Sequence, residues 1–173
     1  MTDENRDKFR RLVEPLFDKM YASAYRLTGS RDDAEDLLQD TFLKAYRSIE
    51  RFEEGTNPGA WVYTIMRNTF LNNIRSKKLR ETLLFDEGAA ERLADTAEPP
   101  SSGEEMDVEL QTVLNSLPPE MRSALVAREI NGLSYQEIAD SLSLPIGTVK
   151  SRINRAREAL KERWMRLKGG PVA

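Results

Sequence analysis

The sequence predicts an all-α protein in which two small helical domains are joined by a flexible acidic linker. Apolar residues recur at steps of three and four through much of residues 9–80 and 108–168, which is the period of helices with one buried face. Between these segments, residues 81–107 hold nine acidic groups and one basic group. A chain of 173 residues is long enough for two small domains. We therefore expect a first domain at 1–82, a linker at 83–107 and a second domain at 108–168.

The first predicted helix has the spacing of a core-facing helix. Its apolar positions are Phe9, Leu12, Val13, Leu16, Phe17, Met20, Tyr21, Ala24 and Tyr25. Pro15 interrupts this pattern, so we expect a kink or a short helix followed by a second one. The Thr-Gly-Ser sequence at 28–30 ends the helix. Core packing is the only role that this segment indicates.

The next helix is expected to begin at Asp32, where Glu35 would complete a capping box. Opposite its buried face, four residues at i, i+3, i+4 and i+7 share one stripe: Asp36, Gln39, Asp40 and Leu43. Carboxylates in such a stripe are usually solvated surface, and without further ligands they do not predict a metal site. A single apolar side chain among acids is typical of an anchor at a protein interface. The stripe is therefore a candidate surface for a protein partner.

Residues 51–60 are expected to form a loop that ends with Asn57 as helix cap and Pro58 at the first helical position. The helix predicted over 58–78 has one apolar face. Its opposite face combines an aromatic ring, hydrogen-bonding groups and a cation: Trp61, Thr64, Asn68, Asn72 and Arg75. Such a face suits unstacked nucleic-acid bases, which stack on aromatics and bond to amides. The alternative is a core tryptophan beside ordinary surface polar residues.

Residues 86–107 are acidic and contain Pro, Ser and Gly, which indicates the flexible linker. The functional alternative is that this segment occupies a basic channel by mimicking nucleic acid. Beyond it, four helices are expected, at about 108–117, 119–130, 134–142 and 145–168. Ser134 and Glu137 make a capping box at the start of the third of these.

The last predicted helix, residues 145–168, carries eight Lys or Arg and two Glu. Its buried stripe comprises Ile146, Val149, Ile153, Ala156 and Leu160. The opposite side presents Ser151, Asn154 and Arg155, with Lys150, Arg152 and Arg157 at its edges. A short helix, a tight turn and a basic helix are typical of a helix-turn-helix that enters the DNA major groove. The alternative is an amphipathic helix pair whose charged face is only solvated.

The composition argues against several classes of protein. The sequence contains no Cys and no His, which excludes disulfides, thiolate metal sites and the commonest general base. It has no glycine-rich phosphate loop and no convergent acid–base pair, so we expect neither an enzyme nor a cofactor or metal. No apolar run could span a bilayer and the N-terminus does not resemble a signal peptide, so we expect a cytoplasmic protein without membrane insertion.

Three ordered stretches resemble a bacterial RNA polymerase sigma factor of the extracytoplasmic-function type. They are DDAEDLLQDTFLKAYRSIERF, NPGAWVYTIMRNTFLNNIR and LPPEMRSALVAREINGLSYQEIADSLSLPIGTVKSRINRAREAL. The resemblance covers roughly residues 9–165. This group of the sigma-70 family keeps only sigma regions 2 and 4, which the resemblance assigns to the first and second domains.

The resemblance implies a role for each candidate surface in transcription initiation. The stripe of Asp36, Gln39, Asp40 and Leu43 would dock on the clamp helices of the polymerase β′ subunit. The loop and the helix after it would melt and read the minus-10 promoter element, with the loop pocketing a flipped-out base. The residues implicated there are Phe52, Trp61, Asn68, Asn72 and Arg75. The loop acids Glu53 and Glu54 depart from the family pattern, so no promoter sequence is predicted.

For the second domain, the resemblance implies contact with the β flap and reading of the minus-35 element. The residues implicated are Thr148, Lys150, Ser151, Arg152, Asn154 and Arg155. The acidic linker would run through the polymerase near the RNA exit path, which favours nucleic-acid mimicry. The family also implies an anti-sigma factor as partner, in a stress response. Two other classes of protein compete with this interpretation, a DNA-binding repressor or activator and a regulator that sequesters polymerase.

Overall fold

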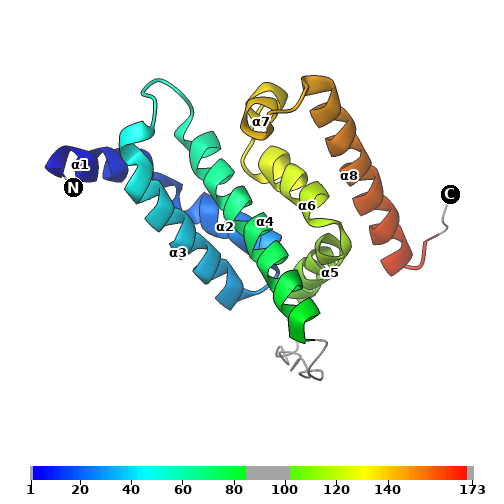
Figure 1. The fold of residues 1–173 in the computed structure, drawn as a ribbon. Helices are drawn as coiled ribbons and strands as arrows, with labels where there is room; N and C mark the ends of the chain where they lie inside the picture. The colour runs from blue at the N-terminus through cyan, green and yellow to red at the C-terminus, as the bar shows by residue number, and fades with distance from the viewer. Residues whose placement is uncertain (1, 85–101, 171–173) are drawn as a thin grey trace.

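The computed structural model describes residues 2–84 and 102–170, with only the backbone for residues 102–106 (Figure 1). These residues form helices and the turns between them, without a strand, which confirms the all-α prediction. The predicted flexible linker falls largely on residues 85–101 and there lies outside the described residues. Its last part, residues 102–107, belongs to a helix.

The first half of the described chain, residues 2–84, is built around three long helices packed side by side. Its elements are α1 (Asp3–Leu12), η1 (Glu14–Leu16), α2 (Phe17–Thr28), α3 (Arg31–Ser48), η2 (Ile49–Arg51) and α4 (Pro58–Leu84). Pro15 lies in the 3₁₀ turn η1, so the expected short helix followed by a second one is confirmed. Asn57 caps α4 as expected, because its Oδ1 accepts a hydrogen bond from the Gly59 amide at 2.9 Å.

The predicted start of α3 is wrong. The helix begins at Arg31 instead of Asp32, and its capping residue is Ser30. Gly29 ends α2 in the left-handed conformation, with φ of 75°, and the next residue becomes the cap. The hydroxyl of Ser30 accepts a hydrogen bond from the Asp33 amide at 3.1 Å. Asp32 therefore lies within the first turn, where its negative charge still favours the helix dipole.

The second half, residues 102–170, forms the expected helical domain. Its elements are α5 (Ser102–Ser116), α6 (Pro119–Leu125), the π-helical turn η3 (Val126–Ile130), α7 (Tyr135–Leu142) and α8 (Ile146–Leu167). The capping box of Ser134 and Glu137 is present at α7. In α8, Val149 and Ile153 are buried as predicted, whereas Ile146 is 40% exposed because it is the first residue of the helix.

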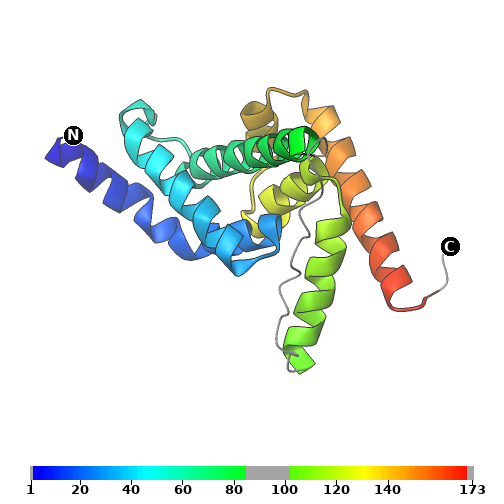
Figure 2. The same ribbon diagram turned by 60° about the horizontal axis from the view of Figure 1, so that its bottom comes forward.

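The two halves pack directly against each other. In Figures 1 and 2, α4 runs between α3 and the second half, and it contacts both α6 and α7. α2 contacts α5, α6 and η3. One buried apolar cluster continues across this interface, from Val62 and Met66 of α4 to Ala124, Ala127 and Ile138. The spacing patterns predicted the helices but left this arrangement open.

Hydrogen bonds also cross the interface. The buried Tyr63 hydroxyl donates to the Ser123 carbonyl at 2.6 Å, and burial raises the pKa of Tyr63 well above its ordinary value. The Asn131 amide donates to the Ser23 hydroxyl at 2.9 Å. Gly29 allows the end of α2 to approach α5, since a Cβ there would lie 2.5 Å from the Asn115 side chain.

Arg122 links helix ends from the two halves. Its guanidinium is buried and donates to the carbonyls of Leu27 at 2.6 Å, Asn115 at 3.0 Å and Leu117 at 3.1 Å. These carbonyls lie at or just beyond the C-terminal turns of α2 and α5, which leave carbonyl groups without partners in the helix. One cation thus caps a helix end from each half, and burial lowers its pKa from the ordinary arginine value.

Candidate nucleic-acid and protein interfaces

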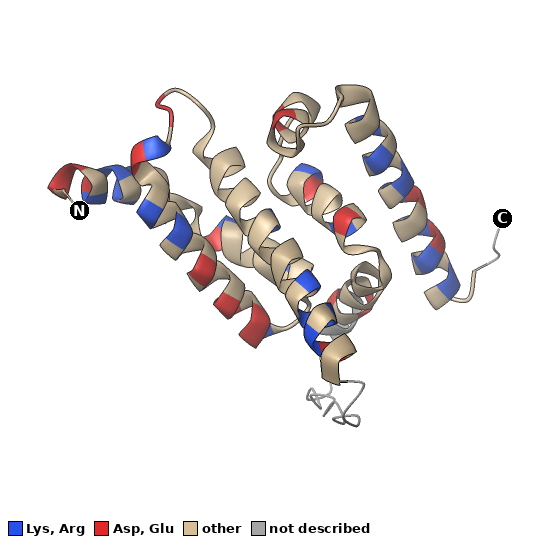
Figure 3. Ribbon diagram, viewed as in Figure 1, with Lys and Arg blue, Asp and Glu red and all other residues tan. Residues whose placement is uncertain are grey.

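The outer side of α8 presents the predicted major-groove residues together. Thr148, Lys150, Ser151, Asn154 and Arg155 are exposed and Arg152 is half-buried, while the inner stripe holds the helix against α6. Four of these six residues, Thr148, Ser151, Arg152 and Arg155, line a hollow of about 610 Å³ between α8 and the start of α6. Figure 3 shows the basic residues repeating along α8. The face can therefore offer cations and hydroxyl and amide groups to phosphates and base edges.

The turn between α7 and α8 sets the orientation of the outer side of α8. Ser143 adopts a left-handed conformation, with φ of 52°, and so reverses the chain after α7 within a few residues. Lys150 lies over the Tyr135 ring, with Nζ 5.9 Å from the ring centroid. Arg157 is hydrogen-bonded to Glu129, which raises the pKa of Arg157. Arg157, which the sequence placed at the edge of the outer face, is thus held by an ion pair within the protein.

The polar face of α4 is divided by the packing of the two halves. Asn68, Asn72 and Arg75 are exposed and lie along one line, as predicted. Thr64 and Arg67, by contrast, lie against α6 and α7 in a small hollow that Ser141 and Leu142 also line. Burial is the main cause that lowers the pKa of Arg67, and the nearby Arg152 lowers it further. Sequence spacing alone did not reveal this meeting of cations from the two halves.

Trp61 and Phe52 pack together at the start of α4. Their ring centroids are 5.2 Å apart, and Trp61 remains partly exposed. Phe52, however, is only 4% exposed, so its ring lies below the surface and cannot meet a base in this conformation. Of the five predicted minus-10 residues, four are therefore accessible and Phe52 supports the loop from beneath. The sequence placed Phe52 at the loop entrance but carried no signal of its burial.

The predicted protein-binding stripe borders an apolar groove. Asp36, Gln39, Asp40 and Leu43 are all exposed on α3, and Leu43 is 47% exposed. Three of them, Asp36, Gln39 and Leu43, line a groove of about 810 Å³ together with Phe9, Phe17, Tyr21 and Phe42. Asp40 faces a different hollow, which Lys77 and Arg80 of α4 also line.

The sequence missed the aromatic wall of this groove. Phe17 was expected in the core but is 50% exposed, with its ring centroid 5.9 Å from that of Phe42. The break at Pro15 separates α1 from α2, so the apolar positions on the two helices do not form one continuous face. A break of this kind next to an apolar stripe is the signal that could have indicated an open groove.

The described residues contain no group of three or more Asp or Glu side chains placed to hold a metal ion. None of the described helices combines the length and the apolar character that crossing a bilayer requires.

Comparison with known proteins assigns both halves. The family model for sigma-70 region 2 matches residues 12–80, and the model for sigma-70 region 4 matches residues 107–160. Over 153 residues the chain is 40% identical to the ECF RNA polymerase sigma factor SigE of Mycolicibacterium smegmatis, covering 87% of this chain and 59% of that relative. The chain thus spans less than two thirds of that relative's length.

Two further similarities extend over most of both chains. The ECF RNA polymerase sigma factor SigW of Bacillus subtilis is 33% identical over 167 residues, covering 91% of this chain and 89% of the relative. The sigma factor RpoE of Bartonella quintana, solved in complex with the anti-sigma factor NepR, has a TM-score of 0.74 and 35% identity, covering 90% and 95% of the two chains. This protein therefore belongs to the extracytoplasmic-function sigma factors of the sigma-70 family, which are transcription initiation factors.

Proposed function

We propose that this protein binds the core of a bacterial RNA polymerase and directs initiation at promoters with minus-35 and minus-10 elements. One observation carries the proposal. Two exposed polar helix faces, on α8 and α4, lie in the two segments that match sigma regions 4 and 2, and α3 adds a groove for a protein partner. This activity takes place in the cytoplasm, where the polymerase works, and needs no catalytic residue of the chain.

The residues divide the work between the two halves. Thr148, Lys150, Ser151, Arg152, Asn154 and Arg155 bind the minus-35 duplex through phosphates and base edges. Trp61, Asn68, Asn72 and Arg75 bind minus-10 bases as these leave the stack, which offsets an unstacking cost of a few kcal/mol. The stripe and groove on α3 bind the β′ clamp, and the second half binds the β flap.

An anti-sigma factor is the proposed regulator. The similarity to RpoE in complex with NepR extends over 90% of this chain and includes both halves. A protein that binds sigma factors of this shape can hold the two halves together and cover the groove on α3. Its release then frees the sigma factor, in a response to stress.

The test is run-off transcription on a library of promoter fragments, with core polymerase alone, with this protein alone and with both. Specific transcripts only when both are present support the proposal and identify the promoter. Tight binding to DNA by the free protein, with the core left unable to initiate, would instead identify a repressor. Binding of the core without any initiation would identify a sequestering regulator.

Replacing Arg155 with alanine should weaken minus-35 recognition by about 1–3 kcal/mol if the guanidinium reads a base edge. The side chain is exposed, lines the hollow beside α6 and lies on the outer side of α8. The measurement is the transcription rate from a minus-35-dependent promoter and from variants of that element. Arg166→Ala, at the far end of the same helix, removes the same charge and is the control. Equal rates for the two variants would exclude this role for Arg155.

A further inference from the structure

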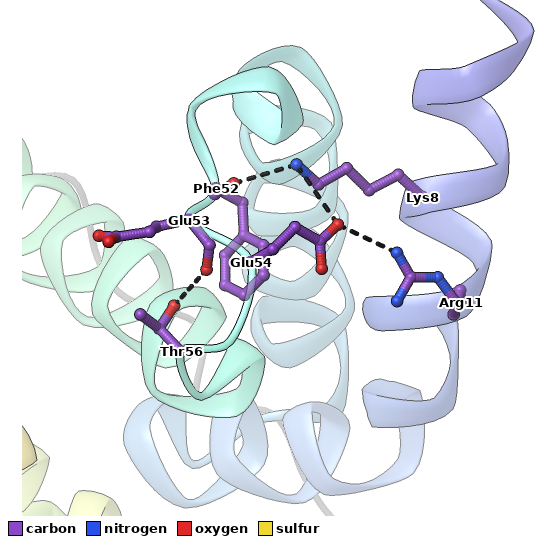
Figure 4. A network of polar contacts seen from close by, with 6 residues as sticks. All are labelled: Lys8, Arg11, Phe52, Glu53, Glu54 and Thr56. Atoms are coloured by element: carbon purple, nitrogen blue, oxygen red, sulfur yellow. Dashed lines mark hydrogen bonds and ion pairs between the residues drawn. The ribbon is translucent and has the colours of Figure 1, made fainter.

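The N-terminal helix α1 is bonded to the segment that leads into α4. Asn5, Lys8 and Arg11 recur at steps of three on one side of α1. Asn5 donates to Glu50, Lys8 donates to the Phe52 carbonyl, and Arg11 donates to Glu54. Figure 4 shows Lys8 and Arg11 reaching from α1 to the loop. Asn5, Lys8 and Arg11 all precede residues 12–80, the segment that matches sigma region 2.

Lys8 is the central member of this contact. Its side chain is only 17% exposed, and its Nζ lies 3.0 Å from the Phe52 carbonyl oxygen and 3.7 Å from a Glu54 carboxylate oxygen. The same ammonium lies 5.7 Å from the centroid of the Phe52 ring. One cation thus holds a backbone carbonyl, a carboxylate and an aromatic ring of the loop. Hydrogen bonds from a charged donor are stronger than neutral ones, so Lys8 strongly restricts the position of Phe52.

Arg11 contributes less than Lys8. The Arg11–Glu54 pair is separated by 3.0 Å, but both side chains are more than half exposed. Exposed ion pairs are screened by water and salt and add little stability. The effect of Arg11 is instead local and electrostatic: with Lys8 it offsets the negative charge of Glu54, which would otherwise repel phosphates near the loop.

The loop itself is an ordered turn beside the candidate base-binding face. The Thr56 hydroxyl donates to the Glu53 carbonyl at 2.7 Å, and Gly55 takes a φ of 90° that permits the reversal. The buried Phe52 ring packs on Trp61, which is partly exposed at the start of α4. A displacement of Phe52 would therefore move both the loop backbone and the support under Trp61.

We propose that Lys8 is a positioning residue for minus-10 recognition, which holds the loop of residues 52–57 and, through Phe52, the Trp61 side chain. Arg11 assists by neutralising Glu54. This inference rests on the proposed function, because it assigns the precision of base capture to a helix outside the matched region 2 segment. It predicts that the loss of Lys8 lowers discrimination among minus-10 sequences while binding to the polymerase is retained.

The test compares Lys8→Met with Arg10→Met in holoenzyme formed with core polymerase. Methionine keeps the unbranched apolar stem and a similar helix propensity, so α1 should remain folded. Arg10 lies on the same helix, is exposed and is 3.9 Å from Glu14, so its replacement removes the same charge without touching the loop. Open-complex formation is followed with 2-aminopurine in the non-template strand, on the promoter found by run-off selection and on single-base variants of its minus-10 element.

Lys8→Met should reduce the preference for the cognate minus-10 element about tenfold, the size expected for losing a hydrogen bond from a charged donor. Its affinity for core polymerase should match that of Arg10→Met, although its midpoint of thermal unfolding should be lower, since a hydrogen bond from a charged donor is lost. A purely structural role would instead lower the rates on all promoters equally. Equal discrimination by Lys8→Met and Arg10→Met would overturn the inference.

Glu54→Gln tests separately whether Glu54 helps Lys8 to hold the loop or acts only as a negative charge near DNA. If Glu54 acted only as a negative charge near DNA, its removal would speed open-complex formation without changing discrimination. If Glu54 helps Lys8 to hold the loop, its removal should lower discrimination about two- to threefold, in line with a weak exposed contact.

The wild-type protein separates the two proposals. If it supports no initiation with core polymerase, the proposed function is refuted. If it is active and the variants discriminate among minus-10 sequences as it does, only the role of Lys8 is refuted.

Discussion

Replacing Leu43 with aspartate is expected to weaken binding of core polymerase by about 2–4 kcal/mol, or from about thirtyfold to about a thousandfold in Kd. Leu43 is 47% exposed at the edge of the groove on α3. An apolar side chain in such a place stabilises a complex by leaving water when the partner docks. A carboxylate at the same position would have to lose its hydration beside Asp36 and Asp40, which carry the same charge.

The measurement is a competition titration of labelled protein against core polymerase. Leu83→Asp is the matched control, because Leu83 is 66% exposed on α4 and does not line the groove. Both variants should unfold at nearly the wild-type temperature, since about half of the Leu43 side chain and most of the Leu83 side chain are already in water. An affinity of Leu43→Asp equal to that of Leu83→Asp would remove the groove on α3 from the polymerase interface.

Replacing Arg122 with methionine is expected to lower the free energy of unfolding by about 2–4 kcal/mol. Methionine fills most of the volume but donates no hydrogen bond, so the carbonyls of Leu27, Asn115 and Leu117 lose a buried donor. The variant also loses the cation that caps helix ends from both halves. The loss should therefore affect the packing of the halves on each other as well as the stability of each.

Arg128→Met is the control for this substitution. Arg128 donates to the Leu133 carbonyl at 2.8 Å and lies 4.6 Å from the Tyr135 ring centroid, both within the second half, so a loss of about 1–2 kcal/mol is expected. Urea denaturation gives the free energies, and fluorescence energy transfer between the halves reports their packing. The sequence contains no Cys, so two introduced cysteines would carry the dyes. A loss of stability by Arg122→Met no larger than that by Arg128→Met would contradict the interpretation.

Local signals predicted the helices because each depends on residues close together in the chain. Ser134 with Glu137 and Asn57 with Pro58 were interpreted correctly, since a cap involves only the next few amides. The exposed faces of α8 and α3 followed from spacing alone. The error at Ser30 arose because two capping groups stood two residues apart. The left-handed Gly29 ends α2 directly before Ser30, and Ser30 therefore becomes the cap of α3.

The remaining features depend on contacts between residues far apart in the sequence. The burial of Phe52 and that of Arg122 are set by neighbours that spacing does not identify. Lys8 lies 44 residues from its carbonyl partner, and Arg122 lies 95 residues from Leu27. A charged residue in a helical pattern is interpreted as solvated unless its partner is known. For this reason the sequence indicated the surfaces of the candidate site but not the side chains that hold them in place.

The buried Tyr63 hydroxyl makes the association of the two halves sensitive to alkali. Its pKa is raised by burial, so the packed protein keeps this phenol protonated at a pH where an opened chain, with an ordinary tyrosine pKa of about 10, would ionise it. The stabilising contribution of the buried phenol is complete below that pH and declines as the pH rises above it. Deprotonation of Tyr63 at high pH thus favours the opened form. A tyrosine phenolate also absorbs at longer wavelength than the phenol. Ionisation of Tyr63 on opening of the interface would therefore add to the absorbance change of the other four tyrosines.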